Sequence, residues 1–403
     1  MKDKGEKTGF RFDRMELAGS LGDLGTLIPL AAGMIVFNKL SPSSVLLWVG
    51  IFYVLAGAYY RLPVPVQPLK VVGALAIASP AAITEPVIAA AGMTFGVILL
   101  VLSFTGAMKA ISTVFTRPVV RGIQLGLGII LMKKGFDLLA APEVFLEGEK
   151  MSFYGVPVNI VLGVAVFVMV FVLLNNRRMP AALAALVVGV AGGLALGGLS
   201  GVSFALGPER LPLLIPGTES FPSFEQFASA MLLLVIPQLP LTIGNAAIGT
   251  ADTACSLFPE SPEIERATPG RFAATMGLIN IPAGLMAAMP MCHGAGGLAA
   301  HYRFGARTGG SNLMIGAVCL VLALAFGKLA LSLLIMIPQS VLGVLLAFAG
   351  IELALLVRDL KERHELFVTV LVAGIAVAGT NMAYAFIAGI LADLLIRKAR
   401  VKV

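Results

Sequence analysis

Residues 61–78 read RLPVPVQPLKVVGALAIA, a proline-rich stretch that leads directly into an apolar run. The prolines at 63, 65 and 68 remove backbone donors and disfavour the helical conformation of the residues before them, so PVPVQP cannot be helical. The following KVVGALAIA has the composition of a helix, and Pro68 lies near its first turn, where proline is tolerated. The stretch predicts a segment that is extended in its first half and helical in its second.

A second stretch of the same kind lies in the other half of the chain. Residues 287–302 read AAMPMCHGAGGLAAHY, in which AMPMC predicts extended backbone and HGAGGLAAHY predicts the start of a helix. The glycines at 294, 296 and 297 have no side chain, so the backbone N–H groups around them can lie open to a ligand.

The composition places both stretches in a membrane protein. Hydrophobic residues make up 58% of the chain, charged residues 13%, and the mean hydropathy is +0.95. Asp, Glu, Lys and Arg are absent from 40–60, 86–108, 179–208, 226–251, 272–302 and 366–392. Each is near or above the roughly 20 apolar residues that span hydrocarbon, which excludes a soluble core.

Extended backbone inside a bilayer is costly unless it lines a cavity enclosed by protein. We therefore expect the stretches 61–78 and 287–302 to lie against each other, each with the N-terminus of its half-helix at the membrane centre. A helix N-terminus offers unpaired N–H donors and about half a positive charge. Two such ends that converge predict an anion site with little formal charge.

The hydropathy pattern predicts an all-α polytopic protein of 14 segments. These are 15–38, 43–60, 63–79, 84–104, 118–136, 157–174, 180–200, 224–249, 270–288, 289–301, 311–331, 335–356, 366–380 and 382–396. With the N-terminus inside, 22 of the 29 Lys and Arg residues fall on the inner side, six fall outside, and Lys70 lies within a segment. This positive-inside bias explains the net charge of +7 without a nucleic-acid partner and predicts that both termini are cytoplasmic.

Landmarks that recur in the same order in both halves predict an inverted repeat. Aligning Pro65 with Pro290 pairs Gln67 with Cys292, and a proline opens a later apolar helix in each half. Because seven segments per half is an odd number, the second half enters the membrane from the opposite side. The predicted divisions are a cytoplasmic N-terminus (1–14), a first repeat (15–204), an external linker (205–223), a second repeat (224–396) and a cytoplasmic tail (397–403). We expect no cleaved signal peptide and no attached soluble module.

Polar residues within the segments define the candidate site. Lys70 lies one turn into the first half-helix. A lysine buried in a membrane span indicates a functional role, although it can also snorkel to the interface or pair with a carboxylate. His293 is a candidate ligand donor, protonation site or helix cap. The amide and hydroxyl groups that suit an oxyanion, or that only hold helices together, are Thr26, Gln238, Thr242 and Asn245. Asp23 can pair with Lys70 or carry a coupling proton.

Four sequence runs resemble the molybdate transporter family, a branch related to the sulfate permeases. They are GDLGTLIPL (22–30), PVQPLKVVGA (65–74), PQLPLTIGNA (237–246) and MPMCHGAGGLAAHYRFGARTG (289–309). The run FTRPVVRGIQLGLGIIL (115–131) is similar to sulfate permeases more broadly, which usually carry a cytoplasmic STAS domain that the molybdate branch lacks.

The resemblance implies the fold of the uracil and sulfate permeases, in which segments 1–4 and 8–11 form a core and segments 5–7 and 12–14 form a gate. It also implies elevator-like movement of core against gate, often in a homodimer, in the plasma (inner) membrane. The half-strand, half-helix elements of that fold correspond here to 63–79 and 289–301, in agreement with the proline pattern.

Together these inferences predict a secondary transporter that imports molybdate between the two half-helices. The anion is expected to lie near Pro68 and His293. Its oxygens are expected to meet the backbone N–H groups around Leu69, Lys70, Gly294 and Ala295 and the neutral donors Gln67, Gln238, Thr242 and Asn245. Sulfate has the same charge and shape, so donor types leave a sulfate transporter open, and tungstate is a further candidate substrate. A nucleobase permease is disfavoured, because 226–251 and 289–301 contain no carboxylate.

The sequence does not identify the coupling ion, which is a proton or sodium. Asp23, His293 and Asp252 are candidate proton carriers. No nucleophile–base–acid set occurs, so we expect no enzymatic activity. Cys255, Cys292 and Cys319 have neither disulfide nor zinc spacing, so we expect no metal and no cofactor.

Overall fold

The computed structural model describes residues 9–108, 116–145, 150–174, 176, 181–197, 205–378 and 382–399 of the chain. The outermost parts of the predicted cytoplasmic ends, 1–8 and 400–403, lie outside the described residues. So do 180 and 198–200 of the predicted seventh segment and 379–380 of the thirteenth.

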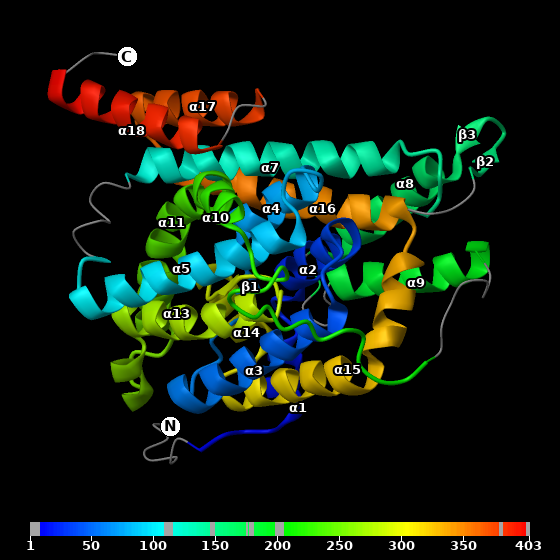
Figure 1. The fold of residues 1–403 in the computed structure, drawn as a ribbon, viewed down its shortest axis with the longest axis horizontal. Helices are drawn as coiled ribbons and strands as arrows, with labels where there is room; N and C mark the ends of the chain where they lie inside the picture. The colour runs from blue at the N-terminus through cyan, green and yellow to red at the C-terminus, as the bar shows by residue number, and fades with distance from the viewer. Residues whose placement is uncertain are drawn as a thin grey trace.

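The chain is mostly helical over the described residues (Figure 1). The helices of the first half are α1 (Arg14–Ser20), α2 (Leu24–Asn38), α3 (Pro42–Tyr60), α4 (Lys70–Ala78), α5 (Glu85–Thr105), α7 (Arg117–Leu139), α8 (Val158–Leu173) and α9 (Ala181–Gly197). Those of the second half are α10 (Phe224–Ala230), η1 (Met231–Val235), α11 (Ile236–Leu241), η2 (Thr242–Gly249), α12 (Thr250–Leu257), η3 (Pro262–Arg266), α13 (Pro269–Leu285), α14 (Ala295–Phe304), α15 (Gly310–Ile335), α16 (Gln339–Ala354), η4 (Leu355–Asp359), α17 (Arg363–Val377) and α18 (Met382–Ala399).

Helical structure lies in each of the predicted segments, and five helices among the described residues are long and apolar enough to cross a membrane. A sixth candidate span consists of α1 and α2, which meet at a bend of 47°. The span Phe224–Leu257 is continuous, but η1 and η2 within it are π-helical. They flank α11, where Pro237 and Pro240 lack the N–H groups that regular helical bonds need.

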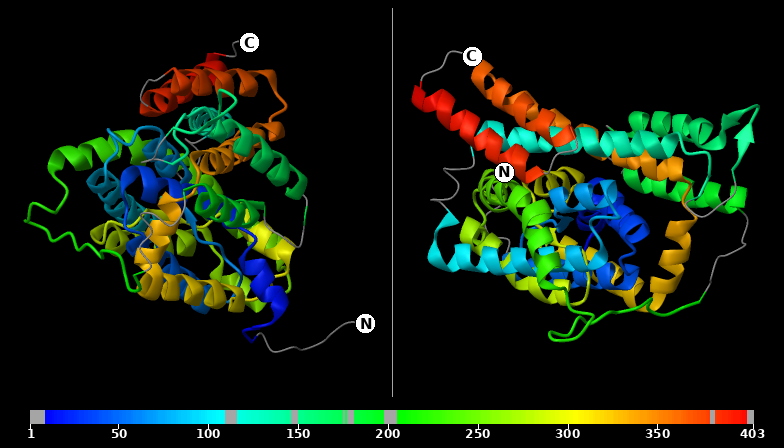
Figure 2. Two further views of the ribbon diagram at one scale, coloured as in Figure 1. Left: turned by 90° about the vertical axis from the view of Figure 1, so that its right-hand side faces the viewer. Right: turned by 45° about the horizontal axis from the view of Figure 1, so that its top comes forward.

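The helices pack in two groups (Figures 1 and 2). We call α1–α5 with α10–α15 the core group, and α7–α9 with α16–α18 the gate group. The most extensive contacts in the core group join α3 to α15 and α13 to α5. An inverted repeat that relates α3 to α13 and α5 to α15 exchanges these two pairs, so the packing has the symmetry that the sequence predicts.

The centre of the gate group is the crossing of α7 and α16, which the repeat relates to each other. A Cβ atom at Gly128 would lie 2.5 Å from the carbonyl oxygen of Gly350, and a Cβ atom at Gly350 would lie 2.5 Å from that of Gly128. Paired glycines let the two backbones approach closely, as is usual where membrane helices cross.

Two short strands, β1 (Gln67–Pro68) and β4 (Met291–Cys292), pair antiparallel within the core group. Gln67 lies opposite Cys292, the same two residues that the repeat alignment makes equivalent. The Leu69 N–H donates to the Pro290 carbonyl at 2.9 Å. The predicted contact between the two half-strand, half-helix segments is therefore present. A second small hairpin joins β2 (Ser152–Phe153) to β3 (Val156–Pro157) outside the core.

Side chains of neighbouring helices satisfy the extended backbone before α4. The carbonyls of residues 63–66 accept, in order, from His301 Nδ1 (3.0 Å), Asn312 Nδ2 (2.6 Å), His293 Nδ1 (2.8 Å) and Tyr53 Oη (3.2 Å). Asn280 does the same for β4, donating to the Met291 carbonyl at 2.7 Å and accepting from the Met291 N–H at 2.8 Å. Because water cannot reach these groups, their partners must be protein.

Candidate functional site

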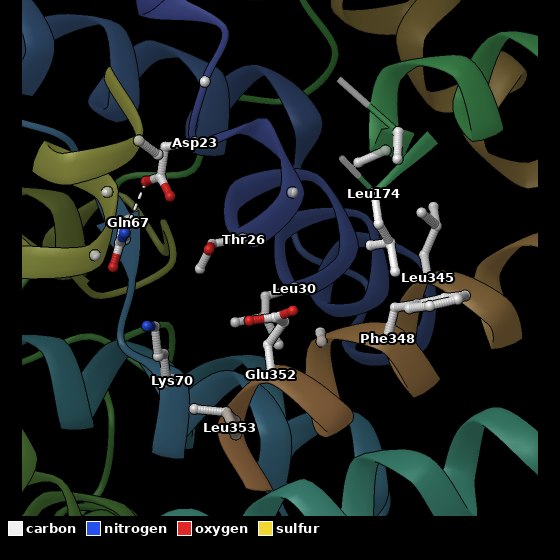
Figure 3. A pocket seen from close by; sticks show the side chains of 18 of the residues that line it. Asp23, Thr26, Leu30, Gln67, Lys70, Leu174, Leu345, Phe348, Glu352 and Leu353 are labelled. Carbon is white, nitrogen blue, oxygen red and sulfur yellow. Dashed lines mark hydrogen bonds between the residues drawn. The ribbon is translucent and has the colours of Figure 1, made fainter. Parts of the chain in front are cut away.

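A cavity of about 340 Å³ lies between the core group and the gate group (Figure 3). The core side contributes α2, β1, α4 and α14, and the gate side contributes α7, α8, α9 and α16. Its polar side chains are Asp23, Thr26, Gln67, Lys70 and Glu352. A cavity at the boundary of two bodies is the position from which a transporter can open to either side.

Three helix N-termini meet at this cavity. Gly25 and Thr26 lie in the first turn of α2, Lys70 begins α4, and Gly296 and Gly297 lie in the first turn of α14. Gly25 and Gly296 are exposed, so the backbone there is not covered by side chains. The unpaired N–H groups and positive dipole ends of these helices make the cavity attractive to an anion.

Asp23 and Gln67 are joined by a hydrogen bond at the edge of the cavity (Figure 3). Gln67 Nε2 donates to Asp23 Oδ2 at 2.7 Å, and both side chains are buried. Gly297 packs against this pair, and a Cβ atom at that position would meet Gln67 Nε2 and lie 2.6 Å from Asp23 Oδ2. This glycine is therefore required for the pair to form as it does.

Lys70 lines the cavity and is partly buried. Among the described residues it has no carboxylate oxygen within the 4.0 Å of an ion pair, and it acts on Asp23 only through longer-range attraction. The sequence left open whether Lys70 pairs with Asp23, but Asp23 takes Gln67 as its hydrogen-bond partner instead. The ammonium group is thus available to a ligand.

The predicted neutral donor Gln238 bonds the backbone of helix α4, and the predicted donor Thr242 bonds Gln238. Gln238 Oε1 accepts from the Val71 N–H at 2.8 Å, and Gln238 Nε2 donates to Thr242 Oγ1 at 2.9 Å. Both side chains are buried and neither lines the cavity. Gln238 thus bonds a backbone donor in the first turn of α4, and the Leu69 N–H, which the sequence predicts to bind the anion, is occupied by the Pro290 carbonyl.

His293 is fully buried and does not line the cavity. Its Nδ1 donates to the Pro65 carbonyl at 2.8 Å and its Nε2 lies 3.1 Å from Thr275 Oγ1. The rings of Phe52, Tyr60 and Phe272 surround it, with centroids 4.7 to 5.6 Å away. In this structure the histidine holds the extended backbone in place.

The other predicted residues do not line the cavity. Pro68, Leu69 and Gly294 are buried in the β1–β4 region, and Ala295 begins α14. Asn245 is partly buried in η2, and Asp252 is exposed on α12. The structure thus brings Asp23, Thr26, Gln67 and Lys70 together, whereas the ligand roles of all the predicted residues stay predictions.

Glu352 is the cavity side chain that the sequence analysis did not single out. It lies on α16 and is exposed to the cavity, across from Lys70 (Figure 3). An ionisable residue within a predicted span is itself a signal of function, and that signal points to Glu352 as well as to Lys70. No group of three or more His, Cys, Asp or Glu residues that could hold a metal occurs in the described part of the chain.

The fold and the site together define a membrane transporter built on two broken segments. A family model described as "Molybdate transporter of MFS superfamily" matches residues 15–131 and 230–353. The chain is 31% identical to Molybdate transporter 1 of Arabidopsis thaliana, over 94% of this chain and 87% of that protein. It is 28% identical to Molybdate transporter 1 of Chlamydomonas reinhardtii, over 96% of this chain and 92% of that protein. The chain belongs to the molybdate transporter family, as its motifs predicted.

Solved structures confirm the predicted fold class. The murine Solute Carrier 26 family member A9 anion transporter, in its inward-facing state, matches 99% of this chain and 70% of its own with a TM-score of 0.68 and 15% identity. The transmembrane domain of the cyanobacterial bicarbonate transporter BicA matches 94% of this chain and 98% of its own with a TM-score of 0.64 and 18% identity. The protein is therefore an integral membrane transporter and not an enzyme.

Proposed function

We propose that this protein imports molybdate by secondary active transport with alternating access. The observation that carries the proposal is the cavity between the core and gate groups, which combines Lys70 with the N-termini of α2, α4 and α14. A tetrahedral dianion requires donors from several directions. One full positive charge and three dipole ends supply them without overcharging the site.

The names of the relatives support molybdate as the substrate. Two Arabidopsis proteins, 31% and 30% identical to this chain, and the Chlamydomonas protein are named molybdate transporters. Tungstate has the same charge and geometry and is expected to compete. Sulfate, the alternative substrate, differs mainly in size, so the donor set alone does not separate the two.

In this proposal the anion contacts the first turns of α4 and α14 and the side chains of Thr26 and Lys70. The core group moves against the gate group, and residues 205–223 form the external linker between the two repeats. We also propose that the protein is a homodimer in the plasma (inner) membrane with both termini cytoplasmic. The bias of Lys and Arg toward the inner side supports this orientation.

The test is uptake of radioactive molybdate by proteoliposomes that contain the purified protein. Lys70→Gln is expected to weaken apparent affinity by about tenfold to a hundredfold, because a hydrogen bond to a charged group is worth ~1.5–3 kcal/mol. Lys328→Gln, an exposed lysine on α15, is the matched control and is expected to leave uptake unchanged. Unchanged uptake in Lys70→Gln would remove Lys70 from the site. Abolition of molybdate uptake by modest sulfate would favour the sulfate alternative.

A further inference from the structure

The amide of Gln67 has one end bonded and one end unpaired. Its Nε2 donates to Asp23 Oδ2, whereas its Oε1 is buried and has no hydrogen-bond partner among the described residues. A buried carbonyl oxygen without a partner is destabilising. As a carboxylate Asp23 can only accept a hydrogen bond, whereas protonated Asp23 also has an O–H to donate, for which the unpaired Gln67 Oε1 is an acceptor.

The unpaired oxygen of Gln67 lies at the N-terminus of α14. A Cβ atom at Gly294, the N-cap residue of α14, would meet Gln67 Oε1 first and the rest of the amide next. An oxygen held there puts a negative dipole end at the N-terminus of α14, where the backbone of Gly296 is exposed, and so disfavours an anion at that terminus. The same amide turned by 180° would present its NH₂ group to that anion instead.

We propose that Gln67 links anion binding to protonation of Asp23 through rotation of its side-chain amide. When Asp23 is a carboxylate, Gln67 Nε2 is used by Asp23 and Oε1 stays buried beside Gly294 at the N-terminus of α14. When Asp23 takes up a proton, its O–H donates to Gln67 Oε1, and the freed NH₂ donates to the anion. One proton from solution ends on Asp23 for each anion bound. No other bond is made or broken.

The proton also relieves a charge conflict in the cavity. Without it, a dianion would share the site with the Asp23 carboxylate, and two like charges in a poorly solvated cavity repel strongly. The ionisable groups that surround Asp23 are Lys70 on α4, Cys292 on β4, Tyr53 on α3 and Glu352 across the cavity on α16. Lys70 is the one cation in this set, and it cannot neutralise Asp23, Glu352 and a dianion together.

This inference rests on the proposed function, because it takes molybdate as the anion. Its first test is calorimetric titration of molybdate into the wild-type protein in buffers of different ionisation enthalpy, over a range of pH. We expect uptake of about one proton per molybdate and an affinity that falls by up to tenfold per pH unit as the pH rises. Binding without proton uptake overturns the inference but leaves the proposed function standing. Absence of molybdate binding at every pH overturns both.

Two substitutions separate the carboxylate from the amide. Asp23→Asn places a permanent donor beside Gln67 Oε1, so binding should remain, lose its pH dependence and take up no proton. Molybdate exchange across the membrane should continue in this variant, while accumulation driven by a pH gradient is lost. Persistent proton uptake in Asp23→Asn would assign the proton to another group, with Asp252 on α12 the next to substitute, and would reject the inference.

Gln67→Met keeps the size of the side chain and removes both ends of the amide. We expect about tenfold weaker binding and a smaller change of affinity with pH, since only direct charge repulsion remains. The full wild-type pH dependence in this variant would reject the amide rotation. Asp137→Asn, at an exposed position near the end of α7, is the control and should behave as wild type in each experiment.

Discussion

Gln238 Oε1 accepts a hydrogen bond from the Val71 N–H at 2.8 Å, which ties the π-helical span of the second repeat to the first turn of α4. The two residues are 167 positions apart in the chain. Because the Val71 N–H has no partner within its own helix turn, Gln238 replaces the water that a soluble helix would use. The contact orients the end of α4 that faces the cavity.

We therefore expect Gln238→Leu to lower stability more than it lowers affinity. The substitution leaves a buried N–H unpaired, which costs about 1–3 kcal/mol. The midpoint of thermal unfolding in detergent should fall, while molybdate should still raise that midpoint in the variant. Thr242→Val removes only the partner of Gln238 Nε2 and should have the smaller effect. A stable Gln238→Leu protein that no longer binds molybdate would instead make Gln238 a ligand.

Gly297→Ala tests the packing around Asp23 and Gln67. A methyl group at this position would meet Gln67 Nε2 and lie 2.6 Å from Asp23 Oδ2, so one of the two side chains must move. We expect molybdate affinity to fall by at least about tenfold, corresponding to ~1.4 kcal/mol. Gly270→Ala on α13 is the control, because a Cβ there has no atom within 4 Å. Equal affinities in the two variants would show that the Asp23–Gln67 pair tolerates displacement.

The sequence predicted the two broken segments correctly because their cause is local. Prolines at 63, 65 and 68 prevent helix formation whatever surrounds them, and the bilayer then requires the extended backbone to be enclosed. The repeat alignment made Gln67 and Cys292 equivalent, and the structure places these two residues opposite each other in the strand pair. Proline positions and hydropathy were therefore enough to predict the two broken segments and their contact.

The roles of individual polar residues were harder to predict, because they depend on which way each side chain points. Gln238 and His293 are suitable donors by chemistry, yet both are used on backbone groups of the half-strand, half-helix region. Glu352 is on the gate side of the cavity, in a segment that the repeat pattern did not connect with the site. Only the packing of α16 against the core group brings it there.

Asn280→Leu tests how far the extended strand β4 depends on side-chain partners. Asn280 bonds both the N–H and the C=O of Met291, so leucine leaves two buried backbone groups unpaired. At about 1–3 kcal/mol for each group, the loss is a large part of the stability of a typical domain. We expect poor recovery of folded protein and a lower unfolding midpoint by fluorescence-detected size-exclusion chromatography. Ser256→Ala, an exposed serine on α12, is the control, and a wild-type midpoint in Asn280→Leu would mean that other groups replace the amide.

Glu352 on the gate group and Lys70 on the core group line the same cavity (Figure 3). A carboxylate beside an anion site weakens anion binding, but in the empty transporter it offsets the charge of Lys70. Glu352→Gln should therefore tighten molybdate binding, by about tenfold if the carboxylate costs ~1.4 kcal/mol. The return of the empty core should become slower, because the described part of the gate then has no carboxylate facing Lys70 and only Asp23 on the core offsets its charge. Net uptake would fall while exchange of molybdate for molybdate stays fast.

Glu352→Asp should retain the wild-type pattern. Weaker binding in Glu352→Gln would contradict the argument, since it would mean that the carboxyl group acts as a donor to the anion rather than as a charge that opposes it.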